Sequence, residues 1–165
     1  MDYLKQTLIL ASASPRRKEL LEQVGIKFSV IPSNVDESKL VLEGEPYEKA
    51  EVSALIKARD VAGKLKEGLV LGADTIVVLD GKIYGKPVDA QHSYEMLKSL
   101  SGKCHQVITG VALVDAATGF YLTGHEKTDV YFSCIQDDEI RQYIDSGEYM
   151  GKAGSYAIQG KGALF

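Results

Sequence analysis

Apolar runs of strand length alternate with amphipathic stretches along the first half of the chain. Residues 7–12 and 27–31 form two short apolar runs, each typical of a strand. The longest run, LVLGADTIVVL at residues 69–79, is rich in β-branched residues and lies between two glycines, as expected of a long strand. Between these runs, residues 46–65 carry alanine at every fourth position, which marks one face of a long helix.

The second half of the chain reads as a hairpin followed by further strands and short helices. Asp80-Gly81 is a turn dipeptide and joins the long strand to KIYGKP. Periodicity then predicts a helix at 89–100 with Asp89 as its N-cap, another helix at 137–145, and strands at 105–114 and 120–133. The chain ends in an apolar Ala-Leu-Phe at 163–165, which predicts the beginning of one more strand.

These elements together predict a single α/β domain that spans residues 1–165. The expected architecture has a central mixed sheet, helices on both faces and a cleft between two lobes. A length of 165 residues suits one domain. The hydrophobic content of 45% and the charged content of 25% are those of an ordinary globular protein.

The charge balance and the cysteines narrow the class of protein further. A net charge of −4 gives no global basic field, and no segment is apolar over the length of a membrane span. We therefore expect neither a nucleic-acid nor a membrane partner. Cys104 and Cys134 have neither CxxC spacing nor a histidine at metal-ligand distance. They are expected to be buried, reduced thiols of a cytoplasmic protein.

The stretch LILASASPRRKELLEQV at residues 8–24 predicts a strand, a turn of small residues and a helix. Ser14 suits the N-cap, Pro15 suits the first helical position, and Gly25 is a typical stop. Three apolar residues at helical spacing form an apolar stripe on this helix: Leu20, Leu21 and Val24.

The first turn of this helix carries the wrong charge for its position. A helix N-terminus is partially positive and favours Asp or Glu, whereas this one has Arg16, Arg17 and Lys18. Two guanidinium groups and free backbone N–H groups at one place are the components of a phosphate or carboxylate site. The alternative is an exposed basic turn on a surface helix, which leaves the conflict with the dipole unexplained.

Asp74 is the most informative acidic residue, because it interrupts the apolar strand at 69–79. An unpaired carboxylate there would cost several kcal/mol, so either the strand opens into a cleft or Asp74 binds a cation. The alternative is a structural carboxylate that caps a turn with Thr75. Asp36 and Glu37 lie in a loop that could face Asp74, and converging carboxylates favour Mg²⁺ or Mn²⁺.

Basic residues elsewhere could join the two arginines in holding phosphates. Lys57 lies in the middle of the helix at 46–65, and Lys86 lies between a glycine and a proline in YGKP. Each lysine alone is a weak signal, but a cluster of cations around phosphates and a metal is what phosphoryl or nucleotidyl chemistry requires. The chain has no GxxxxGK[ST], HExxH or GxSxG motif, which argues against a P-loop enzyme, a zincin and an α/β-hydrolase.

Four motifs, in this order and spacing, resemble those of the Maf (septum-formation inhibitor) family of nucleoside triphosphate pyrophosphatases. They are LILASASPRRKELLEQVGIKF, VDES, LGADTIVVLDGKIYGKP and YAIQGKGALF. The resemblance covers nearly the whole chain, and the combination of SPRR with GADT and GKP is specific. It implies an elongated α/β domain, similar in fold to the inosine triphosphate pyrophosphatases, with a central mixed sheet and a cleft between lobes.

The resemblance also implies an activity, a metal and a set of roles. Family members hydrolyse a nucleoside triphosphate to the monophosphate and pyrophosphate with a divalent metal, here expected to be Mg²⁺ or Mn²⁺. Asp74 would be the catalytic acid/base, and Glu37 would help Asp74 to hold the metal. Five residues would contact the phosphates: Ser12, Arg16, Arg17, Lys57 and Lys86.

Three positions distinguish substrate groups within the family that the chain resembles. Arg16, Thr75 and Gln159 resemble the group that prefers dTTP and UTP, whereas the group acting on 7-methyl-GTP typically has Trp in place of the first arginine. An amide such as that of Gln159 can donate to and accept from the edge of a pyrimidine. Two rival functions stay open: a nucleotide-binding regulator of septum formation without turnover, and a pyrophosphatase for modified nucleotides.

One departure from the family pattern concerns the C-terminal part. The family usually continues past the GALF-like stretch with a strand, a GLP segment and a helix, whereas this chain stops at Phe165. The expectation is therefore a domain that lacks this strand and helix, and it leaves homodimer formation open.

Overall fold

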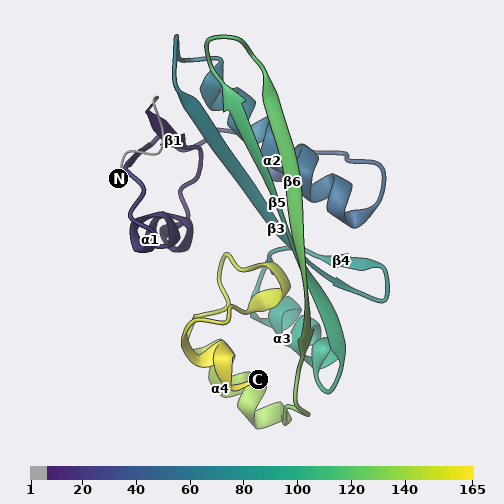
Figure 1. Ribbon diagram of the computed structural model, residues 1–165. Coiled ribbons are helices and arrows are strands. Elements are labelled where there is room, and N and C mark those ends of the chain that lie inside the picture. Colours follow the sequence, from purple (N-terminus) through teal and green to yellow (C-terminus); the bar gives the residue numbers. More distant parts are fainter. Residues whose placement is uncertain (1–6) are drawn as a thin grey trace. The chain divides into compact units, whose positions relative to one another are not determined.

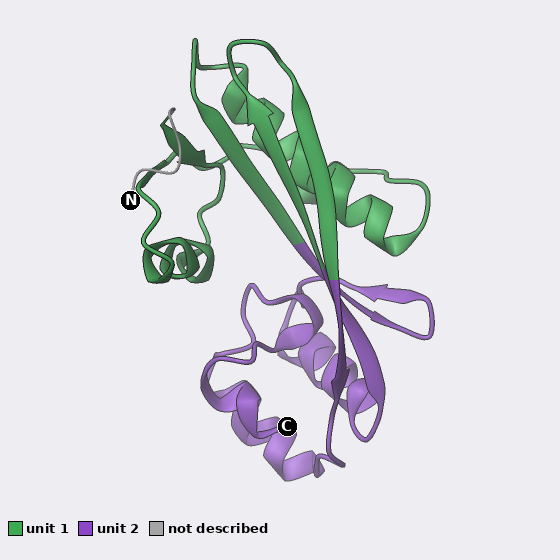
Figure 2. Cartoon of the chain, in the orientation of Figure 1, with its two compact units in different colours: residues 1–74, 109–126 green, residues 75–108, 127–165 purple. Residues whose placement is uncertain are grey.

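The computed structural model describes residues 7–165, which divide into two compact units. Unit 1 comprises the described residues up to Asp74 together with Thr109–Glu126, and unit 2 comprises Thr75–Ile108 and Lys127–Phe165 (Figure 2). The boundary falls within the three longest strands, so each of these strands contributes residues to both units.

Six strands form one mixed sheet (Figure 1). They are β1 (Leu8–Leu10), β2 (Phe28–Val30), β3 (Leu69–Leu79), β4 (Lys82–Tyr84), β5 (Cys104–Asp115) and β6 (Tyr121–Tyr131). The order is β2-β1-β3-β5-β6, and β4 pairs with β3. β1 runs parallel to both β2 and β3, whereas β4 runs antiparallel to β3. The prediction of an α/β fold with a central mixed sheet is confirmed.

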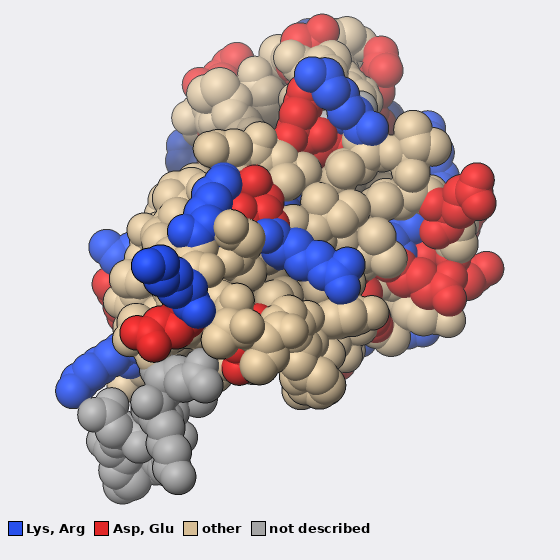
Figure 3. Space-filling model, turned by 90° about the horizontal axis from the view of Figure 1, so that it is seen from above, with Lys and Arg blue, Asp and Glu red and all other residues tan. Residues whose placement is uncertain are grey.

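The helices lie between these strands and after them. They are α1 (Pro15–Gln23), α2 (Pro46–Ala62), α3 (Ala90–Leu100) and α4 (Asp137–Asp145), with short 3₁₀ helices η1 (Glu37–Lys39), η2 (Ala153–Ser155) and η3 (Gly160–Leu164). No helix within residues 7–165 is both long enough and apolar enough to cross a membrane. On the face seen in Figure 3, basic and acidic side chains are interspersed.

The core of unit 1 is built on the alanine face of α2. Ala50, Ala54 and Ala58 have no exposed surface, as their spacing predicts. A Cβ atom placed on Gly72 of β3 would lie 2.2 Å from the carbonyl oxygen of Ala54, and one on Gly110 of β5 would lie 2.2 Å from the carbonyl carbon of Ala50. Small residues on both sides therefore let the helix backbone approach the sheet closely.

The core of unit 2 is rich in rings. The imidazole of the buried His105 lies 4.7 Å from the Phe132 ring, centre to centre, and its Nε2 lies 2.6 Å from the hydroxyl oxygen of Tyr156. Burial raises the pKa of Tyr156 to about 12 and lowers the pKa of His105. Phe165 packs edge-on against Tyr143 and Phe132.

Several local predictions agree closely with the structure. The bounds of β3 and α4 are those that the sequence pattern predicts. Asp89 caps α3, because its side chain accepts a hydrogen bond from the His92 N–H at 2.7 Å. The Asp80-Gly81 turn has positive φ at both residues, 50° and 75°, as a type I′ hairpin turn requires.

Two other predictions were wrong. The tail forms η3 rather than the beginning of a strand, and the Phe165 carbonyl accepts a hydrogen bond from the Ser133 N–H at 2.7 Å. Both cysteines are exposed rather than buried. In α1, two residues of the apolar stripe, Leu20 and Val24, are 55% and 67% exposed.

Candidate active site in unit 1

The close packing of α2 on β3 brings a lysine and an aspartate together. Gly72 and Asp74 are two residues apart on β3, so their side-chain positions lie on the same face of the strand. α2 packs against that face at Gly72, and Lys57 lies on the helix between Ala54 and Ala58. The Lys57 ammonium nitrogen is 2.6 Å from Asp74 Oδ1. A cation, one of the two alternatives that the sequence left open for Asp74, is therefore present within the chain as Lys57.

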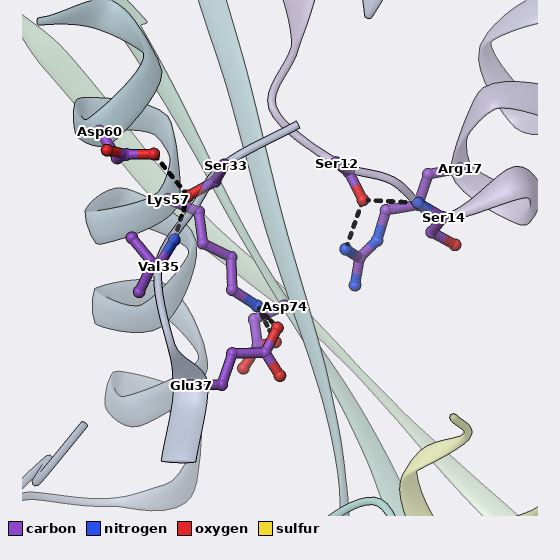
Figure 4. A network of polar contacts seen from close by, with 9 residues as sticks. All are labelled: Ser12, Ser14, Arg17, Ser33, Val35, Glu37, Lys57, Asp60 and Asp74. Carbon is purple, nitrogen blue, oxygen red and sulfur yellow. Dashed lines mark hydrogen bonds and ion pairs between the residues drawn. The ribbon is translucent and has the colours of Figure 1, made fainter. Parts of the chain in front are cut away.

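A second carboxylate meets the same ammonium group (Figure 4). Glu37, the first residue of η1, places Oε1 2.8 Å from Lys57 Nζ. The Lys57 side chain is only 7% exposed, against 18% for Asp74 and 42% for Glu37. The lysine is therefore the buried centre of this cluster, and the two carboxylates approach it from the more accessible side.

Ser12 and Arg17 form the other half of the site. The Arg17 guanidinium donates a hydrogen bond to Ser12 Oγ at 3.0 Å, and the Ser14 N–H donates to the same oxygen at 3.2 Å. Burial lowers the pKa of Arg17, and the neighbouring Arg16 acts in the same direction, whereas the Asp74 and Glu37 carboxylates oppose this. Arg17 is thus within electrostatic range of both acids.

A cavity of about 120 Å³ lies among these groups. It is lined by Ala11, Ser12, Ala13, Arg17, Ser33, Val35, Glu37 and Lys57. Four predicted site residues therefore share one cavity, and a fifth, Asp74, is bonded to the lining lysine. Cationic and anionic side chains around one hollow can hold a phosphate chain and a reacting water together.

Sequence reasoning missed Asp60 of α2 and the two loop residues of this network, Ser33 and Val35. Asp60 Oδ2 accepts hydrogen bonds from the Ser33 hydroxyl at 3.0 Å and from the Asn34 N–H at 2.8 Å. Ser33 Oγ in turn accepts from the Val35 N–H at 3.2 Å, and both Ser33 and Val35 line the cavity. The available signal was position, since Asp60 follows Lys57 by three residues on one helix.

The remaining predicted residues lie outside this cluster or in the other unit. Arg16 is next to Arg17 on α1 but does not line the cavity. Thr75 follows Asp74 on β3, Lys86 follows β4, and Gln159 precedes η3; all three belong to unit 2. Their roles stay predictions, as does a cleft between lobes.

The side chains of the site can be compared with the needs of the Mg²⁺ or Mn²⁺ ion that the sequence led us to expect. Within residues 7–165, no group of three or more His, Cys, Asp or Glu side chains is placed to hold a metal ion. Glu37 and Asp74 nevertheless converge on one positive group. Two carboxylates of this kind fit a Mg²⁺-type ion that takes its other ligands from substrate phosphates and water.

Sequence comparison places the chain among known proteins. Residues 7–165 match the profile of the family described as Maf-like protein. The chain belongs to the Maf family. A Maf relative from Ruminiclostridium cellulolyticum, named dTTP/UTP pyrophosphatase, is 54% identical over 160 residues, which are 97% of this chain and 83% of the relative. One of the same name from Alkaliphilus oremlandii is 50% identical over 159 residues, 96% of this chain and 82% of the relative.

Two solved structures of much lower sequence identity share the fold of this Maf chain. A HAM1 protein from Coxiella burnetii has a TM-score of 0.53 at 19% identity, over 76% of this chain and 72% of that one. A nucleoside-triphosphatase/dITP/XTP pyrophosphatase from Mycobacterium abscessus has a TM-score of 0.50 at 20% identity, over 78% of this chain and 75% of that one. These similarities concern the fold, and they confirm the predicted relationship to inosine triphosphate pyrophosphatase-like folds.

Proposed function

We propose that this protein hydrolyses dTTP and UTP to the monophosphate and pyrophosphate. The observation that carries the proposal is the position of Lys57, whose buried ammonium group joins Glu37 and Asp74 beside a cavity lined by Ser12 and Arg17. Maf relatives named dTTP/UTP pyrophosphatase support the choice of substrates. Arg16, Thr75 and Gln159 would then set the preference for a pyrimidine nucleotide.

The basic groups of the site act on the phosphate chain. Arg17, which donates to Ser12 Oγ, presents a planar guanidinium of the kind that binds phosphate oxygens in pairs. Lys57 and Arg16 would add positive charge, and the sequence predicts the same role for Lys86. Their work is greatest in the transition state, when negative charge builds on the departing pyrophosphate.

The acidic groups act on the attacking water. Lys57 contacts Oδ1 of Asp74, which leaves Oδ2 of the same carboxylate to orient a water and accept its proton. The water then attacks the α-phosphorus, and the bond from that phosphorus to the bridging oxygen of the β-phosphate breaks. Glu37 and Asp74 would also hold a Mg²⁺ or Mn²⁺ ion, which would supply positive charge to phosphate oxygens when bound.

Pyrophosphate release from a panel of nucleoside triphosphates, with Mg²⁺ or Mn²⁺, tests the proposal. We expect dTTP and UTP to be the best substrates, and Asp74→Asn to abolish turnover while nucleotide binding is retained. Glu126→Gln is the matched control, because this exposed residue of β6 lies outside the cluster.

The outcomes separate the rival functions. Binding without release from any nucleotide would overturn the proposal in favour of a regulator of septum formation without turnover. Faster release from a modified nucleotide than from dTTP or UTP would point instead to a pyrophosphatase for damaged nucleotides. Near wild-type release by Asp74→Asn would remove this residue from the mechanism.

A further inference from the structure

One helix of unit 1 contacts the same loop at two points. α2 presents Lys57 to the carboxylate of Glu37, and one turn later it presents Asp60 to the Ser33 hydroxyl and the Asn34 N–H. Residues three apart on a helix lie on one face, so both contacts come from the same side of α2 (Figure 4). The loop from Ser33 to Glu37 is thereby fixed to this helix at both ends.

Glu37 is joined to Asp60 by a short chain of hydrogen bonds through the loop. Its side chain is 42% exposed, and it follows Val35 by only two residues. The Val35 N–H donates to Ser33 Oγ, and that hydroxyl donates to Asp60 Oδ2. Besides the ion pair with Lys57, this short chain of hydrogen bonds, which ends at one carboxylate oxygen of Asp60, helps to set the position of Glu37.

Both oxygens of this carboxylate are in use. Oδ2 accepts the two hydrogen bonds from the loop, and Oδ1 lies 3.0 Å from the ammonium of Lys64 on the solvent side. The Asn34 N–H and Lys64 hold the pKa of Asp60 below its usual range. Asp60 therefore stays charged at neutral pH and keeps its capacity as an acceptor.

We propose that Asp60 is a positioning residue for nucleotide hydrolysis, which holds the 33–35 segment so that Glu37 meets Lys57 and Asp74. The inference rests on the proposed function, since it assigns Asp60 a role in that same site. Asp60 touches none of the reacting groups, and its effect passes through the loop alone. Such supporting residues typically change activity by about 10- to 100-fold.

Steady-state kinetics of three variants test this role. Asp60→Ala removes both acceptors and should lower kcat by roughly 10- to 100-fold, with KM changed far less. Asp60→Asn retains an amide oxygen that can accept from Ser33 and Asn34, so its kcat should stay within about twofold of the wild type. Lys64→Ala is the matched control, since it removes only the exposed ion pair, and it should leave kcat unchanged.

A double variant shows whether the effect passes through Glu37. If it does, Asp60→Ala should lower the residual rate of Glu37→Gln by no more than about twofold. If Asp60→Ala lowered kcat by roughly the full 10- to 100-fold in the Glu37→Gln variant as well, the proposal would be overturned. So would a wild-type kcat in Asp60→Ala, or an equal loss in Asp60→Asn and Asp60→Ala.

Amide hydrogen exchange provides a measurement that does not depend on turnover. In Asp60→Ala, a peptide covering residues 33–39 should exchange faster, whereas peptides from β3 should not. A protein without turnover would refute the proposed function and leave this measurement intact. Unchanged exchange of the loop in an active enzyme would refute the role of Asp60 alone.

Discussion

Gly72→Ala should disturb both the stability of unit 1 and its site. The added Cβ would lie 2.2 Å from the Ala54 carbonyl oxygen and 3.0 Å from the Cβ and the backbone nitrogen of Ala58. Backbone atoms cannot rotate away, so α2 must move by about 1 Å to restore an ordinary carbon–oxygen contact. Overpacking of this kind costs about 3 kcal/mol, which is roughly 6–12 °C in Tm for a chain of this length.

The same displacement should reduce turnover, because α2 carries Lys57. A shift of about 1 Å at a reacting centre can cost roughly 100-fold in rate. Thermal unfolding and pyrophosphate release are therefore measured on the same preparations. The control is Gly124→Ala on β6, where a Cβ meets nothing within 4 Å and should cause no loss. If Gly72→Ala had the Tm and the rate of the wild type, the close approach of helix and strand would not be what joins Lys57 to Asp74.

Three further predictions concern other charges. Arg16→Ala should raise KM for dTTP about tenfold through a lost contact with phosphate, and an unchanged KM in steady-state kinetics would exclude that contact. Glu148→Gln should lower the free energy of unfolding by about 1 kcal/mol near neutral pH, because its carboxylate accepts the Lys161 and Gly162 N–H groups. These bonds lower the pKa of Glu148, so the difference between Glu148→Gln and the wild type should vanish in urea unfolding as pH falls through that lowered pKa. Burial lowers the pKa of His105, so between about pH 7 and about pH 5 the unfolded state binds a proton that the folded state does not. The stability of the wild type should therefore fall as the pH is lowered over this range. The Tm of His105→Gln should fall less over the same range.

The elements that the sequence predicted best are those with a long, uniform pattern and clear ends. β3 is an apolar run between glycines, and α4 begins with a capping box formed by Gln136 and Glu139. The tail was mispredicted because an apolar triplet indicates burial but not the partner it packs against. Its glycines and Glu148 favour η3, and the Phe165 ring is accommodated among other rings.

Periodicity also could not show which faces are covered. The spacing of Leu20 and Val24 shows that they share a face of α1, and both are nevertheless exposed. Whether such a stripe is covered depends on what the rest of the fold places against it. The two cysteines illustrate the same limit, since an average tendency towards burial did not decide their positions.

The individual residues of the candidate site were predictable, but their pairing was not. Lys57 was assigned to phosphates, and Glu37 and Asp74 to a metal, whereas the structure joins all three. The contact depends on how closely α2 approaches β3, which Gly72 and the alanines of the helix determine. Asp60 was missed because an acidic residue in a helix is ordinarily a solvated surface charge, and only the fold shows what it accepts.

The ion cluster around Lys57 has a consequence for the resting protein. Two carboxylates, Glu37 and Asp74, face two cations, Lys57 and Arg17, so the charges of this cluster cancel. Because the cluster has no net charge before a ligand binds, no metal ion is needed to neutralise it. A chelating agent should therefore leave the folded molecule intact, and a lone divalent ion should gain little by entering ahead of a nucleotide.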